Sequence, residues 1–208
     1  MSHKPLSIDD LKIDFLRDHL HYQRKSHRGK QEIIAKALGA AKGIKQVIDL
    51  TCGLAEDAFF LAQIGFSVKA LERCEPIYKV LIASYNKAKL EEPEHPALSR
   101  LEIHFENSVD FLKSPTFLQA EPAAWALYLD PMFPEKKKTA LPRKEMQIFR
   151  SIVGPDLDSA ELFEAAMQSG AARVVVKRPI RAEAVAPGVI HTFEGNTVRY
   201  DLYVPSPR

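Results

Sequence analysis

The stretch LYLDPMFPEKKK, residues 127–138, places an acid at the end of an apolar run and three lysines shortly after it. Such a run is typical of a buried strand, whose carboxyl end would carry Asp130. Pro131 and Pro134 restrict the backbone of the residues that follow. The Asp130 carboxylate and the Pro131 carbonyl are therefore candidate hydrogen-bond acceptors held in fixed directions, as a catalytic site requires in order to position a reacting group.

Polar or acidic residues also follow the other predicted strands. Asp49 precedes Thr51 and Gly53, and small residues in a strand-to-helix turn let a ligand approach the N–H groups of the helix. Glu72 ends the second strand, 19 residues after Gly53, where an acid can accept two hydrogen bonds from a ribose. The third strand ends at Glu106, Asn107 and Ser108, polar groups suited to the edge of an adenine. Taken singly, Asp49 is equally a turn former and Glu72 a surface acid, whereas polar ends on four consecutive strands favour a ligand site.

The class of cofactor follows from the first turn. A nicotinamide dinucleotide fits less well, because the motif G-x-G-x-x-G is absent and only Gly53 remains, flanked by Thr51 and Ala55. A small-residue turn combined with an acid after the second strand fits S-adenosylmethionine (SAM) better. The residues thus predict a SAM site beyond the carboxyl ends of the strands.

The elements that would position these residues alternate along the chain. Apolar runs predict strands over 45–50, 66–72, 100–107, 123–130 and 172–179, and a closing hairpin over 188–195 and 197–205. Helical spacing and capping residues predict helices over 6–20, 30–43, 55–65, 75–90, 108–114 and 158–170, with a loop over 91–99. This alternation predicts an α/β, Rossmann-like fold: a mostly parallel twisted sheet with helices on both faces and a C-terminal antiparallel hairpin.

Composition argues against several classes of protein. The 208 residues suffice for one α/β domain with a short appendage, and no stretch approaches the roughly 20 apolar residues of a membrane helix. The first residues lack the apolar core of a secretory signal, and two cysteines suggest no disulfide framework. The seven histidines show no metal-ligand spacing. We therefore expect a cytoplasmic protein with no membrane contact and no metal.

Positive charge is concentrated in two runs, although the net charge is only +2. Residues 21–30 contain four Lys or Arg and no acid, and residues 136–150 contain six Lys or Arg against one Glu. Each run alone is equally consistent with solvated surface.

Several of these motifs resemble known methyltransferases. DPMFP is similar to the D/N-P-P-F/Y signature of enzymes that methylate the exocyclic amines of bases. The segments DLTCGLAEDAFFLA, LER, YLDPMFP followed by KK.AL..KEM..F.S.VGPDLD, and RVVVKRP resemble the RsmJ type of bacterial small-subunit rRNA guanine-N2 methyltransferase. The similarity covers roughly residues 13–208. Family members usually carry an additional N-terminal segment that is nearly absent here, and their Gly-rich basic turn is reduced here to RKSHRGK.

This resemblance implies methyl transfer from SAM to N2 of a guanosine in 16S rRNA, with the rRNA or the small ribosomal subunit as partner. Residues 1–43 would form an N-terminal helical arm with a basic RNA-facing stretch, and 44–208 the methyltransferase domain. Together with Asp49 and Gly53 from the first turn, the matching cofactor positions are Glu56, Asp57, Glu72, Arg73, Asn107, Ser108 and Asp130.

The chemistry of a guanine amine accounts for the first motif. The lone pair of N2 is delocalised into the ring, so the enzyme must position the amine and accept its hydrogen bonds. Asp130 and Pro131 are the predicted acceptors, and Phe133 can stack on a base taken out of its helix, or instead anchor the loop on the core.

Phosphate contacts are predicted for residues in and beyond the two basic runs: Arg24, Lys25, Arg28, Lys136, Lys137, Lys138, Lys177 and Arg178. Two other functions stay open. D-P-x-F does not choose the base, so an adenine-N6 methyltransferase is one alternative, and an RNA-binding scaffold without turnover is the other.

Overall fold

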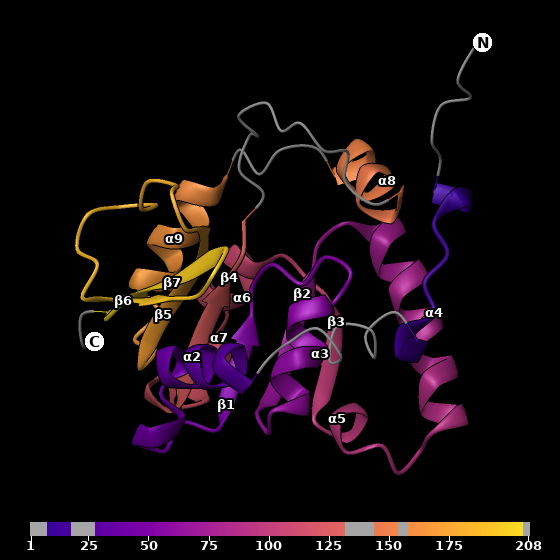
Figure 1. Cartoon of the computed structure of the whole chain (residues 1–208), viewed down its shortest axis with the longest axis horizontal. Helices are drawn as coiled ribbons and strands as arrows, with labels where there is room; N and C mark the ends of the chain where they lie inside the picture. The colour runs from indigo at the N-terminus through magenta and orange to yellow at the C-terminus, as the bar shows by residue number, and fades with distance from the viewer. Residues whose placement is uncertain (1–7, 18–27, 132–143, 154–157, 206–208) are drawn as a thin grey trace.

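The computed structural model describes residues 8–17, 28–131, 144–153 and 158–205. Within these residues, seven strands form one sheet in the order β3-β2-β1-β4-β5-β7-β6 (Figure 1). The strands are β1 (Gln46–Asp49), β2 (Ser67–Glu72), β3 (Leu101–Phe105), β4 (Trp125–Leu129), β5 (Arg173–Pro179), β6 (His191–Glu194) and β7 (Val198–Tyr203). β1 to β5 are parallel, and β7 is antiparallel to both β5 and β6. The predicted fold class is confirmed, including the C-terminal hairpin.

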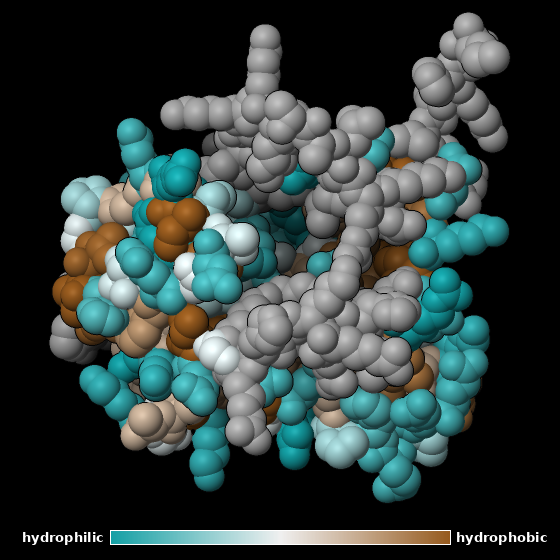
Figure 2. Space-filling model, viewed as in Figure 1, coloured by the Kyte–Doolittle hydropathy of each residue, from teal (hydrophilic) through white to brown (hydrophobic). Residues whose placement is uncertain are grey.

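Helices cover both faces of the sheet, as a parallel sheet requires. They are α2 (Arg28–Leu38), α3 (Glu56–Gln63), α4 (Glu75–Glu91), α5 (Pro96–Ser99), α6 (Ser108–Lys113), α7 (Pro115–Gln119), α8 (Lys144–Val153) and α9 (Ser159–Met167). Short 3-10 turns occur at η1 (Ile8–Asp10), η2 (Ala40–Lys42) and η3 (Pro122–Ala124). Figure 2 shows one face of the molecule, on which the described hydrophilic and hydrophobic residues are interspersed.

Alternate residues of the central strands β1, β4 and β5 enter two different cores, because successive side chains point to opposite faces of a sheet. Val47 and Tyr128 belong to a core with α2, α3, α4 and α5. Ile48 and Leu129 belong to a core with α6, α7 and α9. The four-residue strand β1 is therefore buried on both sides, which fixes the turn after Asp49 relative to the ends of its neighbours.

The helix predicted over 6–20 is wrong as a single element. A 3-10 turn covers Ile8–Asp10, residues 11–14 are not helical, and a helical turn begins at Phe15. The reason is a tertiary contact: the backbone N–H of Phe15 donates to Ser84 Oγ at 2.9 Å, and Ser84 Oγ donates to the carbonyl of Ile13 at 2.8 Å. Docking on α4 thus replaces the local helical hydrogen bonds.

The helix predicted over 30–43 ends earlier, at Leu38. Gly39 has a left-handed φ of 85°, and a Cβ at this position would lie 2.8 Å from Arg173 Nε. Glycine is required here by both its backbone angle and the close approach of Arg173. The Arg173 guanidinium donates to the carbonyl of Ala37 at 2.8 Å, so it also binds the carboxyl end of α2.

α2 packs into the same core as the sheet, with Ile34, Ala37 and Leu38 fully buried. The domain boundary at residue 43 stays a prediction. Sequence reasoning missed α5, α7 and α8; α5 lies in the predicted loop 91–99. None of the described helices has the length and apolarity needed to cross a membrane.

Candidate active site

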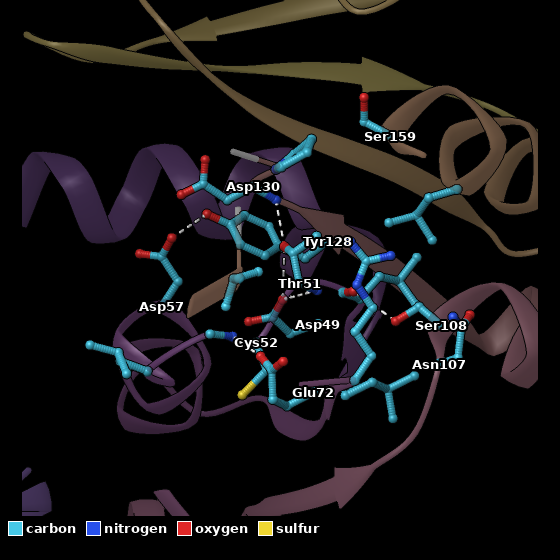
Figure 3. Close-up of a pocket in the computed structure, with 18 of the residues that line it drawn as sticks. Asp49, Thr51, Cys52, Asp57, Glu72, Asn107, Ser108, Tyr128, Asp130 and Ser159 are labelled. Atoms are coloured by element: carbon cyan, nitrogen blue, oxygen red, sulfur yellow. Dashed lines mark hydrogen bonds between the residues drawn. The ribbon is translucent and has the colours of Figure 1, made fainter. Parts of the chain in front are cut away.

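A pocket opens beyond the carboxyl ends of β1, β2, β4 and β5, where the loops of a parallel sheet converge (Figure 3). Its lining comes from the turn after β1, the end of β2, the start of α6, the end of β4, and one face each of α8 and α9. The polar residues that the sequence places at or after the ends of β1, β2, β3 and β4 thus meet at one cavity.

The turn after β1 is built around Asp49, which is 1% exposed. Its carboxylate accepts the backbone N–H of Thr51 at 2.9 Å and the Thr51 hydroxyl at 3.4 Å. Thr51 Oγ1 in turn accepts the backbone N–H of Asp130 at 2.7 Å (Figure 3). Thr51 therefore joins the turn after β1 to the residue that ends β4.

Glu72 forms the wall on the β2 side. Its two carboxylate oxygens accept the backbone N–H groups of Gly53 at 2.9 Å and Cys74 at 2.6 Å, and the residue is 6% exposed. Gly53 has a φ of 56°, and a Cβ there would lie 3.3 Å from the ring of Phe149 on α8. Two backbone donors therefore fix an ionisable acceptor beside a tight turn whose backbone angle favours glycine.

The start of α6 closes the pocket toward β3. Asn107 caps the helix, because its Oδ1 accepts the backbone N–H of Val109 at 2.8 Å. The Ser108 hydroxyl donates to the carbonyl of Leu50 at 2.7 Å, which fixes α6 to β1. Both residues line the pocket with polar groups that are held by the fold.

An ion pair between Arg73 and Asp158 connects the end of β2 to the start of α9, and both residues line the pocket. The Arg73 guanidinium lowers the pKa of Asp158 by a direct hydrogen bond. The side chains are 38% and 35% exposed, so this pair lies at the solvent side of the site.

A charged network joins α3, β4 and β5 on the other side of the pocket. The Lys177 ammonium lies 2.5 Å from Asp57 Oδ2 and 2.8 Å from Asp130 Oδ2. The Tyr128 hydroxyl donates to Asp57 Oδ2 at 2.7 Å (Figure 3). Side-chain exposure is 17% for Lys177, 11% for Asp57 and 41% for Asp130. Asp130 is thus the member of the network most open to a ligand.

Electrostatics in the pocket follow from burial and an excess of acids. Burial raises the pKa of Asp49 to about 7, against the lowering by the Thr51 N–H, and the charges of Asp57 and Asp130 raise it further. Burial also raises the pKa of the Tyr128 hydroxyl well above its usual value. The pKa of the Cys52 thiol is likewise raised by burial, which argues against a nucleophilic cysteine. Perturbed acids in a concave site are typical of functional sites.

The structure brings ten of the predicted site residues together in this pocket: Asp49, Gly53, Glu56, Asp57, Glu72, Arg73, Asn107, Ser108, Asp130 and Pro131. Lys177, predicted to face RNA, also lines it. Arg178 points to the opposite face of β5, is 7% exposed, and donates from Nε to the carbonyl of Glu183 at 2.9 Å. Outside the described residues lie Arg24, Lys25, Phe133, Lys136, Lys137 and Lys138, together with the side chain of Arg28.

Sequence reasoning missed Tyr128, Phe149 and Asp158 as pocket residues. One signal could have found Tyr128: it stands two residues before Asp130 on a predicted strand, so the two side chains share a face. Phe149 and Asp158 come from helices whose placement depends on tertiary packing. Across the described ranges, no group of three or more His, Cys, Asp and Glu side chains is arranged to hold a metal ion.

Comparisons with known proteins agree with this geometry. Residues 2–205 match a family described as putative SAM-dependent methyltransferase. A protein named ribosomal RNA small subunit methyltransferase J from Bdellovibrio bacteriovorus is 46% identical over 195 residues, which cover 93% of this chain and 74% of that protein. The protein of the same name from Dechloromonas aromatica is 37% identical over 201 residues, 96% of this chain and 80% of that one.

Solved structures show the same fold. A SAM-dependent methyltransferase from Neisseria gonorrhoeae superposes with a TM-score of 0.70 at 30% identity, covering 93% of this chain and 74% of that chain. A putative methylase from Haemophilus influenzae, at 17% identity and a TM-score of 0.51, shares the fold over 85% of this chain and 98% of that one.

Proposed function

The chain belongs to the family of SAM-dependent methyltransferases that includes ribosomal RNA small subunit methyltransferase J, and on this premise we propose that it methylates N2 of a guanosine in 16S rRNA. The observation that carries the proposal is Asp130. Its carboxylate lies at the end of β4, is 41% exposed toward the pocket, and has its backbone fixed by Thr51. The substrate is the rRNA or the small subunit, and the place of action is the cytoplasm.

The pocket fits SAM by the chemistry of its donors and acceptors. Glu72 offers an acceptor for a ribose, and the Gly53 turn allows close approach to the backbone. Asn107 and Ser108 would face the adenine. Among the described residues, the acids Asp49, Asp57 and Asp130 lie near the ammonium of Lys177 and outnumber it, which suits a positively charged sulfonium.

When bound, SAM supplies an electrophilic methyl group: the amine nitrogen forms the new N–C bond, the electron pair of the C–S bond stays on sulfur, and the amine gives up one proton. The residues of the chain must hold the amine nitrogen in line with the C–S bond that breaks. The Asp130 carboxylate and the Pro131 carbonyl accept its two N–H groups, and Asp130 stabilises the positive charge that develops on nitrogen. A carboxylate at this position can also hold the released proton.

RNA contacts are proposed for residues around the mouth of the pocket. Phe133 would stack on the target base after it leaves its helix. The basic runs that contain Arg24, Lys25 and Arg28, and Lys136, Lys137 and Lys138, would contact flanking phosphates. The motivation is charge distribution, because both runs are nearly free of acids in a chain with a net charge of only +2.

Methyl transfer to purified small-subunit RNA and to assembled subunits, followed by mass spectrometry of the nucleosides, tests this function. We expect N2-methylguanosine. N6-methyladenosine instead would assign the activity to the adenine. An absence of SAM binding in calorimetry, together with no methylated nucleoside, would point to an RNA-binding scaffold without turnover.

A further inference from the structure

We propose that Lys177 is a positioning residue for methyl transfer, whose ammonium is anchored on Asp57 and holds the Asp130 carboxylate toward the substrate amine. This inference rests on the proposed function, because it concerns how Asp130 meets the amine. It gives Lys177 a place inside the reaction site, whereas the sequence alone suggested a contact with RNA phosphates.

Lys177 contacts two carboxylates, a buried one that serves as its anchor and an accessible one at the other end of the contact. The anchor is Asp57, which is 11% exposed and also accepts the Tyr128 hydroxyl on the oxygen that contacts the ammonium. The accessible end is Asp130, which is 41% exposed. Lys177 is itself 17% exposed. A group that bridges a buried carboxylate and an open one can transmit the rigidity of the first to the second.

Lys177 contacts the side chain of Asp130, whereas Thr51 contacts its backbone. Thr51 Oγ1 fixes the backbone N–H of Asp130 at 2.7 Å, but that bond leaves rotation of the side chain undetermined. The Lys177 ammonium, 2.8 Å from Oδ2, restricts that rotation. Because the acceptor must point at the amine for the lone pair to be positioned, loss of this contact should affect the chemical step more than binding.

Charge gives Lys177 a second effect. Among the described residues, the titratable groups near its ammonium include Asp57 on α3, Asp49 on β1, Tyr128 on β4, and Asp130 directly after β4. Tyr200 on β7 and Arg178 on β5 are the next electrostatic neighbours. Without the ammonium, neighbouring carboxylates would repel one another, and one of them would take up a proton at a higher pH than in the wild type. A protonated Asp130 is a poorer acceptor for positive charge.

A phosphate contact explains the geometry less well. A lysine that serves RNA would present its ammonium to solvent, whereas this one is mostly buried and lies within hydrogen-bond distance of two carboxylates. The two roles also predict different kinetics. A phosphate contact affects KM for RNA and the salt dependence of binding, while a positioning residue affects kcat.

The test compares Lys177→Met and Lys177→Arg with the wild type at saturating SAM. For Lys177→Met we expect kcat to fall by up to about 100-fold, with KM for RNA little changed. The acidic limb of the pH profile should move to higher pH. Lys177→Arg, which keeps the charge and the donors, should recover part of the activity and the wild-type limb. Lys113→Met is the matched control and should behave as the wild type. Lys113 also pairs with an acid, Glu161, but the two side chains are 62% and 61% exposed, far more than the side chain of Lys177.

A second measurement uses the protein without RNA. Carbon-13 NMR of aspartate carboxyl groups should show a titration step at higher pH in Lys177→Met than in the wild type. If Lys177→Met does not fold, as judged by circular dichroism, Lys177→Gln replaces it, because an uncharged amide keeps a donor without the charge.

The outcomes separate the two proposals. A wild type that methylates guanosine, with a Lys177→Met variant of unchanged kcat and pH profile, overturns the positioning of Asp130 by Lys177 and leaves the proposed function intact. A raised KM for RNA with unchanged kcat assigns Lys177 to RNA binding instead. If the wild type methylates no guanosine, the proposed function is wrong. If the carboxyl titration in Lys177→Met is not shifted, the charge effect of Lys177 is wrong, whatever the outcome of the methylation assay.

Discussion

Two charged networks lie on opposite faces of β5, and they differ in balance and in access. On one face, Arg199 and Asp201 of β7 form a two-point ion pair, with Nε–Oδ1 at 2.9 Å and Nη2–Oδ2 at 3.0 Å. Asp201 is fully buried and Arg199 is 12% exposed. Arg199 also donates to the carbonyls of Ile180 and Ala182, at 2.9 and 2.6 Å. Within this pair one acid meets one base, beside the buried Arg178, and Arg199 anchors the chain after β5.

On the other face, the pocket network around Lys177 contains more acids than bases. Asp57 and Asp130 share its ammonium, and Asp49 is buried nearby, where its carboxylate accepts the backbone N–H of Thr51. A balanced, enclosed pair is suited to hold the fold, whereas an excess of acids open to a cavity is suited to bind a cation or accept a proton. The difference predicts that mutations on one face change stability, and on the other face change catalysis.

The largest effect should come from breaking the enclosed pair. Asp201→Asn leaves the Arg199 charge without its carboxylate, and we expect the free energy of unfolding to fall by about 3–5 kcal/mol in urea denaturation. The kcat per folded molecule should not change. Glu161→Gln is the control, because its exposed pair with Lys113 should be worth at most about 1 kcal/mol. A stable Asp201→Asn variant with reduced kcat would reverse the assignment of the two faces.

Asp49 is an exception within the pocket, because it is 1% exposed and its charge therefore affects stability through pH. Its pKa is raised to about 7 in the folded chain, against about 3.9 in the unfolded chain. Between these two values the folded state keeps a proton that the unfolded state loses. The stabilisation is therefore fully present below about pH 4 and is lost as pH rises to about 7 and beyond. The free energy of unfolding should fall by at most about 4 kcal/mol over this range. Asp49→Asn should remove this decline and be more stable than the wild type at pH 8. Urea unfolding from pH 4 to 8 decides the matter, and parallel curves for both proteins would contradict it.

Asp130 should show the opposite pattern to Asp201. Asp130→Asn removes the charge from a side chain that is 41% exposed, so the free energy of unfolding should change by less than about 1 kcal/mol. We expect kcat to fall by about 100- to 1,000-fold at saturating SAM, as when a group that stabilises developing charge is removed. Some loss of SAM affinity is also expected, because the residue lines the cofactor pocket. Near-normal turnover in this variant would remove Asp130 from the mechanism.

Glu72 tests the cofactor side of the same pocket. Glu72→Gln should weaken SAM binding by about 1.5–3 kcal/mol in calorimetry, if its carboxylate accepts hydrogen bonds from the ribose. The same carboxylate accepts two backbone N–H groups, so unfolding must be measured alongside. Glu75→Gln, three residues later and paired with Lys79 in solvent, should bind SAM normally. Unchanged affinity in a folded Glu72→Gln variant would show that the β2 end does not hold the ribose.

Local patterns predicted the sheet and the acidic strand ends because both are short-range features. The run VID and the small residues after it indicate a buried strand and a turn without reference to the rest of the chain. Likewise Glu72 and Asp130 end apolar runs, and parallel strands bring such ends to one edge. The sequence was sufficient there because a single rule of topology converts position along the chain into position in space.

The charged partners could not be predicted in this way. Lys177 is separated by 120 residues from Asp57 and by 47 from Asp130, and nothing local indicates that its ammonium turns into the pocket. Phe149 is also distant from Gly53 in the sequence, and most of its helix lies within the basic run over 136–150. At the N-terminus, Ser84 of α4 overrides the helical pattern around Ile13 and Phe15. In each case a tertiary contact decides between outcomes that the local sequence allows equally.

The smallest effect is expected outside both networks, in the basic runs. RNA binding should weaken, and its salt dependence should flatten, when either basic run is neutralised. The two triple variants change Arg24, Lys25 and Arg28, or Lys136, Lys137 and Lys138. Each phosphate contact that is lost should remove about 0.7 to 0.9 from the log–log slope. Unlike the pocket variants, both triple variants should keep SAM affinity and the choice of base, because phosphate contacts position RNA but carry little sequence information.

Binding of small-subunit RNA across a salt series, with calorimetry of SAM on the same preparations, measures this separation. The exposed Lys79 and Lys87 on α4, each paired with a glutamate one turn away, offer a control double variant to Gln that removes charge elsewhere on the surface. If the two triple variants keep the wild-type slope, or if the control flattens it equally, the basic runs act only as solvated charge. RNA would then have to be held by the pocket and its rim, and a positive charge such as Arg181, which follows β5, becomes the next residue to neutralise.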